Sequence, residues 1–260
     1  MNILKQLKQF AVTMICITSV FACKTNKESN LEFTPITVAD SIQNYSNDTA
    51  ISNIISINYF DAKITKNGDS VACNINNDFF AWLEPFFDNG GNQVTKDNLK
   101  DVVASEIKRF IKDINEDKSL ADCESCKHAE LFIDTLPIYQ NDKIVSLVYT
   151  FNQYSGGAHS TYGLTAFNYK KDGTPVTTEN LSKNINELSE IAQKAFIQQN
   201  GELKDYWFDD NKFYLPEVFY FTEKSVIFYY SLYEIAAYSA GDIYIELNND
   251  DVKHLIEYIN

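Results

Sequence analysis

The chain has 260 residues and carries 22 lysines and arginines against 36 aspartates and glutamates, so its formal net charge is −14 at pH 7. Such an acidic surface repels phosphate backbones, which excludes nucleic acid as an expected partner. It also repels anionic lipid headgroups. A basic protein would instead be attracted and steered by this charge.

The first 22 residues have the pattern of a secretory signal peptide. Lys5 and Lys8 precede an apolar stretch at residues 10–22, which is shorter than the roughly 20 apolar residues that span a bilayer. The following boundary, Val20-Phe21-Ala22-Cys23, resembles the bacterial lipobox. This resemblance implies cleavage before Cys23 and lipid attachment to it. The alternative is an ordinary signal peptide with an incidental cysteine.

Export with a lipid on Cys23 predicts a bacterial cell-envelope lipoprotein, at the outer membrane and on its periplasmic or surface face. Loss of two lysines with the signal leaves 20 basic residues against 36 acidic ones, a mature charge of −16. Membrane contact is then expected only through the lipid anchor. Residues 23–50 are polar and without an apolar period, so we expect a tether that turns partly into a first edge strand.

The rest of the chain alternates strand and helix patterns in two blocks. Residues 51–64 are rich in β-branched and aromatic residues and predict a strand. Residues 95–117 predict a helix with Thr95 as N-cap, because apolar residues recur on one face at Leu99, Val102, Val103, Ile107, Phe110, Ile111 and Ile114. Three strand patterns follow at 129–140, 143–154 and 160–176, with turn residues at Asp142 and Asp172-Gly173, and predict an antiparallel meander.

The second block begins with a helix pattern at 184–201 that ends on Gly201. Two aromatic strands at 213–235 turn around residues 222–224, and a shorter strand follows at 242–248. Residues 249–260 predict a terminal helix capped by Asn249 or Asp250. This order predicts an α+β fold, an antiparallel sheet with helices packed on one face. We expect two consecutive subdomains, at residues 51–150 and 151–260.

Three cysteines remain after the signal and the lipidated residue, namely Cys73, Cys123 and Cys126. Haem attachment needs histidine directly after the second cysteine of the pair, where Lys127 stands. A zinc site needs four ligands, and a second ligand pair is missing. An exported location therefore favours a disulfide, between Cys123 and Cys126 or from one of them to Cys73. We expect no metal and no cofactor.

Two segments carry the candidate site residues. In "FNQYSGGAHSTYG" at 151–163, two adjacent glycines demand a particular backbone path. His159 is then either a catalytic group or part of the shaped loop, where it bonds a backbone carbonyl or packs at a sheet edge. In "SLYEIAAYSAG" at 231–241, tyrosines on a loop of small residues are suited to contact a partner, and Glu234 caps a turn or reaches back to the glycines. The candidate ligand-binding residues are Tyr154, Gly156, Gly157, His159, Tyr233, Glu234 and Tyr238.

These motifs carry a resemblance to a known family. "YSGGAH", then "YEIAAYSAG" and a terminal "LNNDDVKHLI" resemble the RsiV-like family, domain of unknown function 3298. The family usually has proline where Ala237 stands. It includes the extracellular part of the RsiV anti-sigma factor, a lysozyme receptor. Its members often carry an upstream domain of family 4163, which would occupy residues 50–150.

The leading functional hypothesis is a non-catalytic binding module of the cell envelope. Its expected partner is a basic protein such as a lysozyme-like muramidase, or a peptidoglycan component of the cell wall. The two alternatives are an envelope structural or assembly protein, and an exported hydrolase of wall glycan or peptide that uses His159 and Glu234 as acid and base. Whether the protein is an enzyme stays open, and no catalytic residue is assigned.

Overall fold

Two long strands that alternate inward and outward side chains open the structure. In this computed structural model, which describes residues 31–46, 49–64, 70–117, 123, 125–136 and 138–259, β1 (Leu31–Ser46) pairs antiparallel with β2 (Thr49–Ile64) along their whole length. Residues 1–30, and with them the expected signal peptide and the lipidation site Cys23, lie outside the described residues.

The first sheet grows from this hairpin in the order β1-β2-β3-β5-β4, and β6 pairs antiparallel with β5 from Ile144 to Gln153. Its further strands are β3 (Glu130–Thr135), β4 (Tyr139–Gln140), β5 (Ile144–Tyr154) and β6 (Thr161–Lys170). Only the pairing of β2 with β3 is parallel. The expected meander is therefore present. Asn141 sets the turn before β5, since its side-chain oxygen accepts the N–H groups of Lys143 and Ile144.

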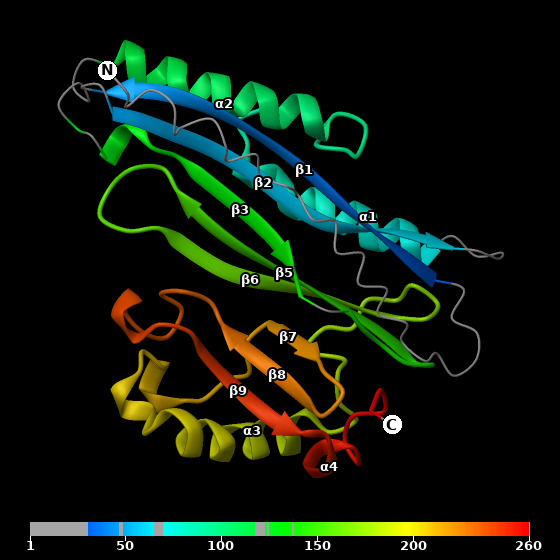
Figure 1. Ribbon diagram of the computed structural model, residues 1–260. Helices are drawn as coiled ribbons and strands as arrows, with labels where there is room; N and C mark the ends of the chain where they lie inside the picture. The colour runs from blue at the N-terminus through cyan, green and yellow to red at the C-terminus, as the bar shows by residue number, and fades with distance from the viewer. Residues whose placement is uncertain are drawn as a thin grey trace, which may run out of the picture.

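Two helices cover one face of this sheet, α1 (Ser70–Leu83) and α2 (Leu99–Glu116), as Figure 1 shows. The pattern analysis missed α1, although Val71, Ile75, Phe79 and Leu83 repeat every four residues and all four are buried. Phe79 stacks on Tyr59 of β2 and contacts Tyr149 of β5. The first core therefore lies between these helices and the central strands.

The second sheet, in the order β7-β8-β9, is entirely antiparallel and packs on α3. Its elements are α3 (Ile185–Asn200), β7 (Val218–Phe221), β8 (Ser225–Tyr230), β9 (Ile243–Asn248) and the short α4 (Asn249–Val252). Helix α3 follows its sequence signals closely. Asn184 accepts the N–H of Glu187 as N-cap, and Gly201 ends the helix with a φ of 110°.

The two sheets lie beside each other where β7 meets β6 (Figure 1). Asn168 of β6 donates from its side chain to the carbonyl of Phe219 at 2.7 Å, and the Ser146 hydroxyl accepts the N–H of Phe221 at 3.2 Å. Ile144, at the start of β5, belongs to the second core. The expected division at residue 150 thus falls inside β5, a strand that both cores share.

The edge strand expected within residues 23–50 is present as β1, because residues such as Phe33 and Val38 pack against the first core. Helix α2 begins at Leu99, and Thr95 has the expected capping role. Its hydroxyl accepts the N–H of Asn98 at 3.4 Å, while the side-chain oxygen of Asn98 accepts the N–H of Thr95 at 2.8 Å.

One expectation is corrected, the terminal helix at residues 249–260. The helix stops at Val252, and the apolar residues after it fill the second core from turns instead of from a helix face.

No helix within the described ranges is both long enough and apolar enough to cross a membrane. The mixed α and β composition with mostly antiparallel pairing agrees with the expected α+β class.

The second core generates a stability prediction at Phe196 of α3. Its side chain is fully buried and contacts the rings of Tyr206, Phe208, Phe213 and Tyr230. Phe196→Ala should lower the free energy of unfolding by about 3–5 kcal/mol, because it removes these contacts and leaves a cavity. Chemical denaturation measures the loss, and Phe196→Leu should lose clearly less. A loss for Phe196→Ala below about 1 kcal/mol would contradict this packing.

Candidate ligand-binding site

The connection between β5 and β6 has a backbone that requires its glycines. Gly156 and Gly157 have φ values of 87° and 105°, in the region that residues with a Cβ rarely occupy. The hydroxyl of Tyr154 donates to the carbonyl of Gly157 at 3.0 Å and closes the loop. Residues 155–160, here named the glycine loop, thus form a defined turn.

The second motif forms the loop between β8 and β9, residues 231–242, here named the tyrosine loop. Tyr233 has a φ of 65°, which is unusual for a bulky residue, and Gly241 has a φ of 72°. Ala237 has a φ of −70°, which is the value that proline fixes. The backbone therefore keeps a proline-compatible path at the position where the resembling family has proline.

The two loops meet through their rings. His159 stacks on Tyr238 with ring centroids 3.9 Å apart and an angle of 22° between the planes. Tyr162 of β6 meets the same tyrosine edge-on at 5.7 Å, and Tyr233 lies 6.1 Å from it. These four residues, His159, Tyr162, Tyr233 and Tyr238, are named the aromatic cluster. Tyr233 is 54% exposed, so the cluster offers a ring surface to a partner.

His159 takes part in this surface and in the loop backbone. Its Nδ1 lies 3.0 Å from the carbonyl oxygen of Ser160, which places the proton on Nδ1 because a carbonyl only accepts. Its other contact is the stack on Tyr238. No hydrogen bond joins His159 to Glu234, and both residues lie in the described part of the chain. The contacts are those expected for a shaped loop.

Glu234 is committed to the tyrosine loop. One carboxylate oxygen accepts the N–H of Ser231 at 2.8 Å, and the other accepts the hydroxyl of Tyr214 at 3.2 Å. It therefore caps a turn, one of the two roles expected for it. The pKa of Tyr214 is raised to about 12, mainly by burial and second by the negative charge of Glu234. This hydroxyl therefore stays protonated at neutral pH.

The candidate residues thus divide into groups. His159, Tyr233 and Tyr238 come together in the aromatic cluster. Gly156 and Gly157 shape the glycine loop. Glu234 holds the tyrosine loop through its hydrogen bonds. Tyr154 instead faces another environment, where its ring lies 5.5 Å from that of His128.

Sequence reasoning missed Tyr162, Tyr214 and Trp207 around this site. Tyr162 stands on β6 directly after the glycine loop, and Tyr214 is 41% exposed beside Glu234. Trp207 is 56% exposed, and its backbone N–H donates to the carbonyl of Ile235. Strand alternation after Gly157 could have indicated Tyr162, whereas nothing local connects Trp207 to residue 235.

A disulfide joins Cys123 and Cys126, and Cys73 on α1 is a free, exposed thiol. Pairing of Cys73 with either of them is therefore excluded. The described residues hold no group of three or more histidine, cysteine or acidic side chains placed to bind a metal ion.

Comparison with protein families gives two matches. Residues 175–250 match the family described as "Protein of unknown function (DUF3298)", and residues 64–162 match the family described as "Deacetylase PdaC". The first range contains the tyrosine loop and the second contains the glycine loop. The resemblance of the C-terminal motifs to family 3298 is confirmed, and the matches indicate a function related to the cell envelope. The RsiV-like character and the 4163-like upstream domain stay predictions.

Solved structures show the same fold. A member of the DUF3298 family from Bacteroides fragilis superposes with a TM-score of 0.65 at 20% identity, over 87% of this chain and 93% of that one. A DUF3298 family protein from Pseudomonas aeruginosa gives a TM-score of 0.52 at 14% identity, over 86% and 94%. At these identities the likeness concerns the fold. No curated protein matches the chain.

The positive φ of Tyr233 generates a prediction at that residue. At most positions glycine is less stable than alanine by about 0.5–1 kcal/mol, whereas the left-handed region penalises a Cβ by about 1–2 kcal/mol. Tyr233→Gly should therefore be more stable than Tyr233→Ala by up to about 1 kcal/mol in chemical denaturation. Both variants lose the same ring, so alanine is the matched control. If Tyr233→Ala were the more stable variant, the backbone would not be strained here.

The pair of Tyr214 and Glu234 generates a pH prediction. A tyrosine pKa raised from 10.0 to about 12 contributes stability below pH 10 and loses it as the pH rises toward 12. Glu234→Gln removes the carboxylate charge, so Tyr214 should ionise at lower pH. The measurement is phenolate absorbance, taken as the difference between each protein and its Tyr214→Phe partner. Identical titration curves with and without Glu234 would contradict the coupling.

Proposed function

We propose that the protein is a lipid-anchored binding module of the cell envelope and that it does not catalyse a reaction at this site. The first proposed ligand is a basic protein such as a lysozyme-like muramidase. The second, if no such protein binds, is a peptidoglycan component. The observation that carries the proposal is the stack of His159 on Tyr238, which joins two motif loops and leaves Tyr233 exposed beside them.

Tyrosines suit this role because they bury a large area with little loss of side-chain freedom and keep a polar tip. The loops are also held before any ligand arrives. Tyr154 bonds the glycine loop, while Glu234 bonds the tyrosine loop. A preformed surface binds with a smaller ordering cost than a mobile one.

Charge supports a basic partner. The chain carries a net charge of −14. Asp242 lies beside the cluster and accepts a hydrogen bond from Tyr229. The pKa of Tyr162 is raised first by burial and second by the negative charge of Asp242. A positively charged protein would associate faster with such a surface at low ionic strength, and salt would weaken the effect.

The bonding of His159 and Glu234 favours binding over hydrolysis. A general acid and base at a hydrolytic site must reach the same substrate bond. Here the carboxylate of Glu234 is occupied by Ser231 and Tyr214, and the imidazole of His159 lies against Tyr238.

The test is calorimetric titration of the purified full-length protein in detergent with a basic lysozyme at low and at physiological salt. We expect binding that weakens with salt. Tyr233→Ala and Tyr238→Ala should each weaken it about tenfold or more, because tyrosines that anchor an interface carry much of its energy.

The matched control is Tyr244→Ala. Tyr244 is 49% exposed on β9 and makes no ring contact with the cluster among the described residues, so its loss should leave affinity within about twofold. Absence of heat at low salt would exclude the lysozyme partner, and sedimentation with peptidoglycan would then test the wall ligand. Failure of both would favour a structural or assembly role.

A further inference from the structure

Asp242, at the end of the tyrosine loop, is an exposed carboxylate that the protein holds in place. Its Oδ1 accepts the hydroxyl of the buried Tyr229 at 2.9 Å. Its Oδ2 has no hydrogen bond or ion pair with any other residue that the structure describes. The carboxylate is therefore positioned before a ligand arrives and keeps one oxygen available to a donor.

This carboxylate lies next to two rings of the aromatic cluster. The pKa of Tyr162 is raised first by burial, then by Asp242 and by Tyr238, so both groups lie near its hydroxyl. Tyr162 and Tyr238 meet edge to face with their ring centroids 5.7 Å apart, and both side chains are partly exposed. A ligand group that bonds Oδ2 of Asp242 can therefore also contact an aromatic ring.

The carboxylate and the rings favour the same sign of charge. The face of an aromatic ring is the negative part of its quadrupole and attracts a cation. A carboxylate forms a stronger hydrogen bond with a charged donor than with a neutral one. An anionic ligand would instead be repelled by Asp242 and by the net charge of −14. The site therefore suits a cation that also has N–H donors.

Among the cations that a protein can offer, the guanidinium group of arginine fits this site best. It is planar, so it can lie flat on a ring while the N–H groups at its edge donate to a carboxylate. It is also more weakly hydrated than the ammonium group of lysine, and therefore loses less when a partly exposed ring replaces its water.

We propose that Asp242 and the rings of Tyr162 and Tyr238 bind the guanidinium group of an arginine side chain of the partner protein. The guanidinium lies against a tyrosine ring and donates to Oδ2 of Asp242. This inference rests on the binding role proposed for the aromatic cluster. It adds Asp242 as the residue that selects positive charge there.

Glu246 offers a matched comparison for Asp242. It lies four residues further along the chain on β9, about 13 Å away in a strand, and is also exposed. Its backbone bonds the side chain of Gln199. After burial, its charge raises the pKa of Tyr220, whereas it does not act on Tyr162. Neutralising Glu246 therefore removes the same charge from the protein and leaves the cluster intact.

The test is ligand-observed NMR on the full-length protein in detergent at about 0.1 M salt, where charges are screened beyond about 10 Å. The probes are N-acetylarginine amide, N-acetyllysine amide and N-acetylcitrulline amide, whose side chain is planar but neutral. We expect saturation transfer to the side chain of the arginine probe. The citrulline probe should bind about tenfold more weakly or worse, and the lysine probe should also bind more weakly.

Failure of the arginine probe to bind at millimolar concentration would overturn the proposal. Equal or tighter binding of the citrulline or the lysine probe would overturn it as well.

Two pairs of variants locate the site. Asp242→Asn keeps an oxygen for Tyr229 and removes the charge, so it should weaken binding of the arginine probe about tenfold or more. Glu246→Gln should leave it within about twofold. Tyr162→Leu removes the ring and should weaken binding, whereas Tyr162→Phe keeps the ring and should bind as the unchanged protein does.

Titration of the same variants with a basic lysozyme separates this inference from the proposed function. Equal lysozyme binding by the unchanged protein and by Asp242→Asn would overturn the arginine site and leave the proposed function standing. Binding of the arginine probe without binding of lysozyme would exclude the lysozyme partner and leave the arginine site standing. If Asp242→Asn fails to fold by circular dichroism, the Tyr162 pair decides, and equal binding of the arginine probe by both variants would overturn the proposal.

Discussion

The hairpin of β5 and β6 is the constraint on which the rest of the molecule depends. Tyr149 in β5 is fully buried in the first core, while Ile144 of the same strand is buried in the second. Asn168 of β6 ties the hairpin to β7 through the carbonyl of Phe219. Because one hairpin belongs to both halves, its turn has a fixed place relative to the second sheet. That turn is the glycine loop.

The aromatic cluster follows from this placement. Two glycines with positive φ turn the chain so that His159 reaches Tyr238, which arrives from the loop between β8 and β9. Tyr233 is held in a left-handed conformation that its side chain disfavours. Such strain persists only where the surrounding structure enforces it, and it concentrates at functional sites. The hydrogen bonds of Glu234 to Ser231 and Tyr214 provide that enforcement.

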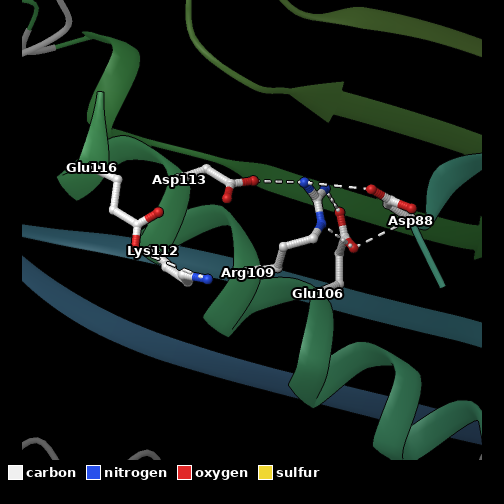
Figure 2. Close-up of polar contacts among 6 residues, drawn as sticks. All are labelled: Asp88, Glu106, Arg109, Lys112, Asp113 and Glu116. Carbon is white, nitrogen blue, oxygen red and sulfur yellow. Dashed lines mark hydrogen bonds and ion pairs between the residues drawn. The ribbon is translucent and has the colours of Figure 1, made fainter. Parts of the chain in front are cut away.

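The acidic character of the chain acts differently in two places. Beside the cluster, Asp242 places a negative charge near Tyr162, which would favour a positively charged partner surface. At the pocket between α2 and the strands β2, β3 and β5, Glu106, Asp113 and Asp88 instead surround Arg109, so this cation is paired within the protein (Figure 2). The glycine loop lies between these two environments, since Ser155 lines the pocket and His159 belongs to the cluster.

Patterns in the sequence were sufficient to predict the helices, strands and turns that are determined by residues close to one another in the chain. Helix α3 was predicted with its glycine end, and the antiparallel meander with its turns, because these signals act within a few residues. The need for glycine at 156 and 157 was also readable, since two glycines in a strand region are otherwise costly. Helix α1 carried a readable signal that was overlooked.

Tertiary packing decided the rest. The apolar residues after Val252 have helical spacing in the sequence, but in the structure they lie in turns and are buried in the second core. Burial of these side chains stabilises the protein more than one further turn of helix would. The stack of His159 on Tyr238, and the pocket with Asn53 beside residues of α2, β3 and β5, join segments far apart in the chain. No local pattern encodes such contacts. They exist because strand pairing and core packing bring distant segments to the same place.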